Sequence, residues 1–209
     1  YSGSAPAGTI LNDERPAPGA IRHVSGQMLP DVVFGCLAQA VPERVPAEGT
    51  SCLWNVTLGS RGQGTPFMIT AVHNGGTGAR PTKPGLNATA YPSGVKGTPV
   101  EITESVSPLL YRRRELRDGS GGAGARHGGD GQVLEFSHRE GEAFGLWAAF
   151  DRIEHPPRGR QGGQDGAPGR AYLDDGTPVS GKGEQDIPAG RSLILETPGG
   201  GGYGTGEAR

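Results

Sequence analysis

Histidine, cysteine and acidic side chains carry most enzyme and metal chemistry, and in this sequence they are scattered. The five histidines form neither an H-E-x-x-H motif nor an i, i+4 pair, so no metal site is predicted from this chain alone. Cys36 and Cys52 match neither a disulfide framework nor a zinc pattern, and both are expected to be buried thiols in a reducing compartment. No serine lies in a G-x-S-x-G motif, which argues against the nucleophile elbow of α/β-hydrolases.

Two glycine-rich runs, 119–124 and 199–204, match G-x-G-x-x-G. A dinucleotide fingerprint needs a helix N-terminus directly after the turn, where it holds the pyrophosphate. Residues 125–131 are too rich in glycine to begin such a helix, and only five residues follow Gly204. We therefore predict no cofactor-binding residues in either run. We interpret the glycines as positions of positive φ or close backbone approach, which form tight turns or nests of N–H donors.

The charged residues give no sign of an ionic partner. The chain has 20 Lys and Arg against 22 Asp and Glu, a net charge of −2, which is no basic footprint for nucleic acid. The arginine run 112–114 is expected to be a solvated strand face rather than a phosphate site. No apolar run is long enough to span a membrane, and the first residues lack the features of a signal peptide. We predict a cytoplasmic protein without nucleic-acid or membrane partners.

The composition indicates a folded but glycine-rich unit. Of 209 residues, 39 are Gly and 18 are Pro, while the small net charge lacks the self-repulsion typical of disordered chains. Residues 1–22 are spaced by prolines and are expected to form an extended arm, followed by a single β-rich domain over 23–209. Because residue 1 is Tyr rather than Met, we expect the chain to be processed or to be a piece of a longer protein.

One helix is predicted, from about Ser25 to Ala40. Apolar residues recur at helical spacing, and Ser25 can act as the N-cap. Pro30 is expected near the first turn, where its missing N–H costs least, and Pro42 ends the helix. The helix is apolar around most of its circumference and the rest of the chain is glycine-rich. We therefore expect the helix and the arm to be docked on another chain or on a missing part of the protein.

The remaining regular structure is predicted to be strands. Seven segments rich in β-formers are expected to be strands, namely 52–58, 66–73, 100–106, 109–116, 132–137, 143–150 and 192–197. Residues 61–64 predict a hairpin turn. The long connections 75–99 and 156–188 hold too much Gly and Pro for regular structure, and connections of this length are usually functional or form part of an interface. The predicted fold class is α+β, mostly antiparallel β with one apolar helix near the N-terminus and long Gly/Pro-rich loops.

Five segments are distinctive, namely 21–27 (IRHVSGQ), 91–101 (YPSGVKGTPVE), 119–131, 166–170 (GAPGR) and 196–204 (ETPGGGGYG). In this order and approximate spacing, from about residue 8 to residue 204, they resemble the C-terminal part of hydantoinase B/oxoprolinase proteins. Thr77 stands where the family often has Trp, and Ala125 where it commonly has Tyr. These departures leave the choice of substrate open.

The resemblance implies the B-type component of an ATP-dependent enzyme system. In such systems an A-type component of actin-like fold activates the substrate or bicarbonate by phosphorylation, and the B-type component completes the chemistry. The family's metal-binding His and Asp residues lie in the N-terminal part of the B component. ATP with Mg and a metal ion are therefore expected in partner components, and none in this chain. The implied partners are the N-terminal half of the B component, an A-type ATP-binding subunit and a small-molecule substrate, in a hetero-oligomer.

The resemblance predicts a hydantoinase- or 5-oxoprolinase-type hydrolase of cyclic amides, in which this chain completes the B component and is not active alone. The alternatives are a subunit of a related ATP-dependent ketone carboxylase and a noncatalytic β-rich interaction module. The catalytic residues are not identified by the sequence. The best candidates for polar groups that reach a reaction centre are His23, Asn55, Asn74 and Arg80. Each of them could instead be a structural residue at a loop end.

Overall fold

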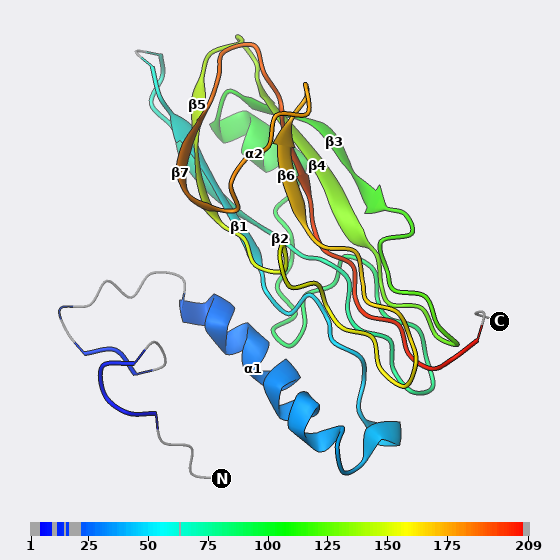
Figure 1. Ribbon diagram of the computed structural model, residues 1–209. Coiled ribbons are helices and arrows are strands. Elements are labelled where there is room, and N and C mark those ends of the chain that lie inside the picture. Colours follow the sequence, from blue (N-terminus) through cyan, green and yellow to red (C-terminus); the bar gives the residue numbers. More distant parts are fainter. Residues whose placement is uncertain (1–4, 10–11, 15, 17–21, 63, 207–209) are drawn as a thin grey trace.

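Two antiparallel four-stranded sheets share one hydrophobic core in the computed structural model, which describes residues 5–9, 12–14, 16, 22–62 and 64–206 (Figure 1). The first sheet has the order β2–β1–β5–β7, with β1 Trp54–Ser60, β2 Met68–His73, β5 Phe144–Ala149 and β7 Lys182–Ile187. The second has the order β3–β4–β8–β6, with β3 Leu109–Arg117, β4 Gly131–His138, β8 Leu193–Glu196 and β6 Arg170–Leu173. The helical elements are α1 Arg22–Leu37, η1 Pro42–Arg44 and α2 Val100–Val106. The α+β class with a predominance of antiparallel sheet is confirmed.

Alternate residues of the central strands form the core between the sheets. Trp54, Val56 and Leu58 of β1 and Leu134 and Phe136 of β4 have at most 1% of their surface exposed. This spacing of two follows from the pleat of a strand, which turns successive side chains to opposite faces. Strands β1 and β2 also form the predicted hairpin, with paired residues running from Trp54↔His73 to Gly59↔Met68.

Two strands were not predicted from the sequence, and both lie at sheet edges. Strands β6 and β7 fall within the connection 156–188, which was expected to lack regular structure. Strand β7 buries only its last residue, Ile187, and β6 has only four residues. An edge strand with one pairing partner needs little apolar surface, so neither segment carries the pattern that predicts a strand.

The segment 100–106 is helix α2 and not the predicted strand. Pro99 precedes the helix directly, where its fixed φ is compatible with a helix start. The buried residue is Thr103, whereas Ile102 and Val106, which a strand would bury, are 52% and 65% exposed. The backbone N–H of Tyr111 in β3 donates to the carboxylate of Glu104 over 2.9 Å, and this bond ties α2 to the neighbouring strand. Contacts with β3 therefore favour a helix in this segment, although its alternation of apolar and polar residues suggested a strand.

Helix α1 begins earlier and ends earlier than predicted. It starts at Arg22, so Ser25 lies inside the helix and is not its N-cap, and it ends at Leu37 before a turn. Pro30 lies in the middle of the helix rather than near its first turn. Val24, near its first turn, packs in the hydrophobic core and fixes this end of α1.

The two cysteines and the arginine run differ in how well their exposure was predicted. Cys52 is buried as expected, but Cys36 is exposed on α1, so the prediction of two buried thiols was wrong for Cys36. The arginine run 112–114 is exposed, as predicted. The expected arm over 1–22 lies largely outside the described residues. Among the residues described, no helix is long and apolar enough to cross a membrane.

Glycine-rich connections run side by side beyond the sheets and hydrogen-bond to one another (Figure 1). We call this region the glycine bundle. Its segments are 47–50, 75–80, 120–131, 157–167 and 198–204. Segment 198–204 exchanges backbone hydrogen bonds of 2.8–3.1 Å with all four other segments. The central position of this segment explains how connections with so little apolar surface are held in order.

Close backbone approach, rather than positive φ, accounts for most glycines of the bundle. A Cβ on Gly199 would lie 1.8 Å from the carbonyl oxygen of Ser120, and a Cβ on Gly200 would lie 2.0 Å from that of Thr77. Glycine is required at the crowded axis of collagen for the same reason. Within the two G-x-G-x-x-G runs only Gly119 and Gly204 have positive φ. The predicted close backbone approach is therefore confirmed, and the predicted positive φ was wrong for the other glycines of the two runs.

Candidate functional site

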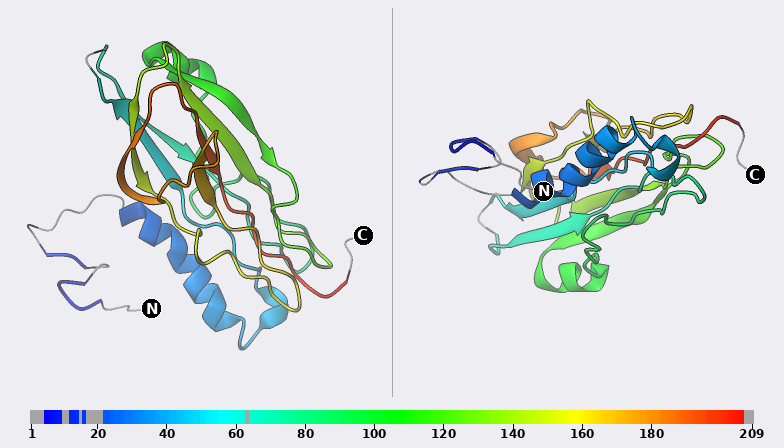
Figure 2. Two further views of the ribbon diagram at one scale, coloured as in Figure 1. Left: turned by 45° about the horizontal axis from the view of Figure 1, so that its top comes forward. Right: turned by 90° about the horizontal axis from the view of Figure 1, so that it is seen from below.

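A cavity of about 260 Å³ lies between α1 and the glycine bundle, and we call it the α1 pocket. Its lining residues are Asp31, Phe34, Pro46, Ala47, Gly49, Thr77, Gly78, Arg80, Leu86, Thr89, Ala90 and Tyr91. The rings of Phe34 and Tyr91 stack with centroids 6.5 Å apart. Figure 2 shows α1 lying across the connections that supply the opposite wall. A concave, mostly apolar cavity with a few fixed polar groups is typical of a small-ligand site.

Two polar side chains of the wall are engaged by protein partners. Arg80 donates through Nε and Nη2 to the carbonyl of Pro84, over 3.1 and 2.6 Å. The hydroxyl of Thr77 accepts a hydrogen bond of 2.7 Å from the N–H of Leu86. These bonds hold the wall in shape. The pocket therefore offers a ligand mainly apolar contact.

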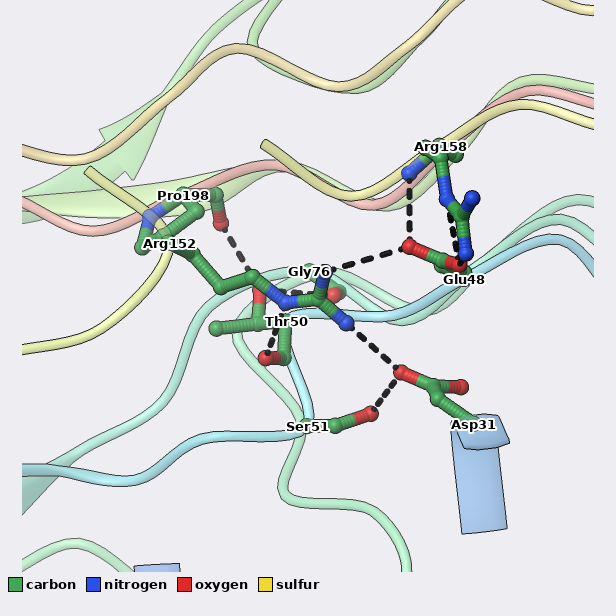
Figure 3. A network of polar contacts seen from close by, with 8 residues as sticks. All are labelled: Asp31, Glu48, Thr50, Ser51, Gly76, Arg152, Arg158 and Pro198. Atoms are coloured by element: carbon green, nitrogen blue, oxygen red, sulfur yellow. Dashed lines mark hydrogen bonds and ion pairs between the residues drawn. The ribbon is translucent and has the colours of Figure 1, made fainter. Parts of the chain in front are cut away.

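A buried ion network underlies the α1 end of the pocket (Figure 3). The guanidinium of Arg152 lies 3.0 Å from Asp31 Oδ2 and 3.1 Å from Glu48 Oε2. The Ser51 hydroxyl donates to Asp31 Oδ2 over 2.6 Å, and Nε of Arg158 donates to Glu48 Oε1 over 2.8 Å. The three side chains at the centre, Asp31, Glu48 and Arg152, are each at most 9% exposed. The network therefore fastens α1 to two segments of the bundle.

The two carboxylates of the network have shifted pKa values of opposite sign. Burial raises the pKa of Asp31, and this effect outweighs the Ser51 hydrogen bond and the charge of Arg152. Burial alone would raise the pKa of Glu48 as well. Hydrogen bonds from the side chain and the backbone of Arg158, together with the charge of Arg152, hold that pKa below its usual value. Glu48 is therefore the firmly ionised member of the pair.

The structure places the four residues singled out from the sequence in three different surroundings. His23 Nε2 and Asn55 Nδ2 lie 2.7 Å apart, between α1 and β1. Asn74 donates to the carbonyl of Val95 over 3.3 Å, and its Oδ1 is buried without a hydrogen-bond partner. Arg80 lines the α1 pocket. Their roles in catalysis stay predictions. Within the described part of the chain, no group of three or more His, Cys, Asp or Glu could hold a metal ion.

The sequence analysis missed the ion network, although one signal pointed to it. Asp31 is the only charged residue between residues 24 and 42. A single carboxylate within an apolar helix is expected to be paired if it is buried. Its partner Arg152 lies 121 residues away, in a segment of no distinctive pattern. Sequence alone therefore indicates that Asp31 needs a cation, but not which one.

Comparison with known proteins places this geometry in a family. The family model described as hydantoinase B/oxoprolinase matches residues 2–206. A putative B-type subunit of the D-/L-hydantoinase of a Pseudomonas species is 32% identical over 96% of this chain and 34% of its own length. A 5-oxoprolinase of Arabidopsis thaliana is 33% identical over 96% of this chain and 15% of its own length. The chain thus spans about a third or less of these relatives.

Solved structures agree with the sequence comparison. The ATP-dependent caprolactamase of Pseudomonas jessenii matches with a TM-score of 0.80 and 26% identity, over 97% of this chain and 38% of that one. Nucleotide-free acetone carboxylase matches with a TM-score of 0.61 and 18% identity, over 80% of this chain and 28% of that one, which shows a shared fold. The match of the family model over nearly the whole chain is decisive: the chain belongs to the hydantoinase B/oxoprolinase family.

Proposed function

We propose that this chain is part of the B-type component of an ATP-dependent cyclic-amide hydrolase, and that it needs the rest of that component for turnover. The proposal rests on the share of each relative that this chain matches. The relatives named as a hydantoinase subunit and a 5-oxoprolinase match 96% of the chain, while the chain spans only 34% and 15% of them. The internal partners of two charged side chains in the α1 pocket support the second part. Asp31 is paired with Arg152 and is therefore not free to act as a base, and Arg80 is held by the carbonyl of Pro84.

In this proposal the α1 pocket binds the ring of a small cyclic amide. Its apolar wall excludes water, and the Arg152 network holds α1 in position through Asp31. Activation by ATP with Mg, and any metal ion, are assigned to the A-type subunit and the N-terminal half of the B component. The assembly is accordingly a hetero-oligomer, and we place it in the cytoplasm.

Two alternatives remain beside the hydrolase. A ketone carboxylase is suggested by the match to acetone carboxylase, but at 18% identity that match concerns the fold. The caprolactamase match is stronger in both TM-score and identity, and therefore favours amide hydrolysis. A noncatalytic interaction module would keep the fold without the chemistry, since a fold alone does not imply a function.

The pocket assignment predicts a specific effect of filling it. Ala90 lines the α1 pocket, so Ala90→Leu places three further carbon atoms into the cavity. In the assembled enzyme we expect kcat/KM for the cyclic amide to fall about tenfold or more, with a stability change under about 1.5 kcal/mol. The matched control is Ala189→Leu at an exposed turn, which should leave kcat/KM unchanged. Equal kcat/KM values for Ala90→Leu and wild type would show that the α1 pocket does not bind the cyclic amide.

The reaction class is tested on the assembled components. Hydantoin, 5-oxoproline and caprolactam are each offered with ATP, and acetone is offered separately with ATP and bicarbonate. We expect ATP-dependent ring opening of at least one cyclic amide, measured as the amino-acid or carbamoyl product. Bicarbonate-dependent loss of acetone without any ring opening would favour the carboxylase. No reaction with any of the four compounds would favour the noncatalytic module.

A further inference from the structure

Helix α1 exposes a continuous apolar stripe on the side away from the glycine bundle. We call it the outer face of α1, formed by Leu29, Val32, Val33, Cys36 and Leu37. The four aliphatic side chains are 42% to 62% exposed. Their spacing of three and four residues places them on one side of the helix.

The opposite side of α1 is fixed, so the helix cannot turn to hide this stripe. Val24 and Met28 pack on the hydrophobic core, and Asp31 is held by Ser51 and Arg152. Turning the outer face inward would break the Asp31 ion pair and expose the core residues. The exposure of the outer face is therefore a property of the docked helix.

The outer face also lacks the features of a solvated helix surface. From residue 24 to residue 42 the only charged residue is Asp31, which points into the protein. A solvent-exposed helix face usually carries charged or polar side chains. An uncharged aliphatic stripe of this kind is typical of a surface that is covered in the working protein.

We propose that the outer face of α1 is covered by an apolar helix or sheet from the remainder of a B-type polypeptide, to which this chain is covalently joined or with which it assembles. This inference rests on the proposed function. The solved caprolactamase chain is matched over only 38% of its length, so such a polypeptide has ample additional structure. The expected partner surface is aliphatic and uncharged, because a charge placed against this stripe would lose its hydration without gaining a counter-ion.

The size of the stripe favours a partner from the same polypeptide over a second copy of this chain. A fully buried aromatic side chain removes about 150–250 Å² from water, so four half-exposed aliphatic side chains offer at most about 400 Å². A stable interface between separate proteins buries about 800 Å² on each partner. A tethered segment needs less area, because linkage raises its effective concentration.

The chain contains its own probe for this contact. Cys36 lies within the stripe and is exposed, whereas Cys52 is buried and its burial raises the pKa of that thiol to about 12. Only the thiolate reacts readily with a maleimide, so Cys52 serves as the silent internal control. Labelling at neutral pH should modify Cys36 quickly in the chain alone. In the presence of the remainder of the B-type polypeptide, the labelling rate should fall by at least about tenfold.

Two variants test whether the protection comes from the stripe. Val33→Asp places a charge in its centre and should restore fast labelling of Cys36 in the B-type assembly. Ile102→Asp places the same charge on the exposed side of α2 and should leave the protection intact. Circular dichroism of both variants in the chain alone checks that neither substitution lowers the overall helix content.

The readout is independent of turnover, so it separates this inference from the proposed reaction. Cys36 that is already protected in the chain alone, as in a stable homodimer, would overturn the proposal. Cys36 that stays equally reactive in the B-type assembly, or becomes protected only when the A-type subunit is added, would overturn it as well. Protection in an assembly that opens no cyclic amide would support the contact and contradict the proposed function.

Discussion

Replacing Gly76 with alanine is expected to destabilise the glycine bundle by about 3 kcal/mol or more, at the upper end of the cost of overpacking. The new Cβ would lie 1.7 Å from the carbonyl oxygen of Gly129, and backbone cannot move aside as a side chain can. Residue 76 is also held on both sides, because its N–H donates to Pro198 over 3.0 Å and its carbonyl accepts from Thr50 over 2.9 Å. The expected loss is a large share of the stability of a typical domain.

Urea denaturation followed by tryptophan fluorescence measures this change as a lower midpoint. Gly26→Ala is the matched control, because Gly26 lies in α1 with no atom within 4 Å of the new Cβ. That variant should be more stable than wild type by up to about 1 kcal/mol, since alanine has the higher helix propensity. A midpoint for Gly76→Ala equal to that of wild type would show that the bundle is not packed as described.

Replacing Arg152 with methionine is expected to destabilise the protein by about 3–5 kcal/mol at neutral pH, because removal of one partner strands a buried charge. Arg152 is the cation shared by Asp31 and Glu48, and both carboxylates are nearly inaccessible to water. Glu48 keeps Arg158, but Asp31 keeps only the Ser51 hydroxyl and a backbone N–H. The attachment of α1 to the bundle should therefore be the first contact to fail.

The loss of stability caused by Arg152→Met should depend on pH in a defined direction. Without Arg152 both carboxyls lose a cation, so both folded-state pKa values rise. The pKa of Asp31, already raised by burial, moves further above that of the unfolded chain, while Glu48 keeps the hydrogen bonds of Arg158. A group with a raised folded pKa costs stability above that pKa, and the cost disappears as the pH falls toward its unfolded pKa. The difference in unfolding free energy between wild type and Arg152→Met should shrink between about pH 7 and about pH 5.

A matched arginine on the surface gives the comparison for this network. Arg113 pairs with Glu115 at about half exposure, so Arg113→Met should cost less than about 1 kcal/mol and show no such recovery in acid. If Arg152→Met costs no more than Arg113→Met, the network does not hold α1. A deficit for Arg152→Met that is constant with pH would show that Asp31 and Glu48 are not left as buried charges.

The sequence predicts the core strands well because their apolar residues alternate and are bounded by turn residues. It fails at α2 and at β7, for opposite reasons. In α2 the alternation of Val100 to Val106 mimics a strand, while contacts with β3 impose a helix. In β7 a polar segment becomes a strand because the neighbouring strand β5 offers free backbone groups. Both outcomes depend on contacts between distant segments, which local pattern does not contain.

The candidate site could be predicted only in part. Arg80 was singled out and lines the pocket, and His23 and Asn55 were singled out together and are in contact. The pocket itself and the Arg152 network arise where α1 meets segments far along the chain, so no local spacing indicates them. The glycine runs predicted close backbone approach, which the structure confirms, but the five segments that approach one another become known only from the structure.

We propose that this chain is a necessary and, by itself, insufficient part of an ATP-dependent cyclic-amide hydrolase. The most direct measurement is ring opening of 5-oxoproline, hydantoin and caprolactam, each with ATP, by the full set of components and by the same set after single omissions. The account predicts turnover only when this chain, the rest of the B component and the A-type subunit are all present. Turnover by this chain alone, or undiminished turnover after its omission, would contradict the account.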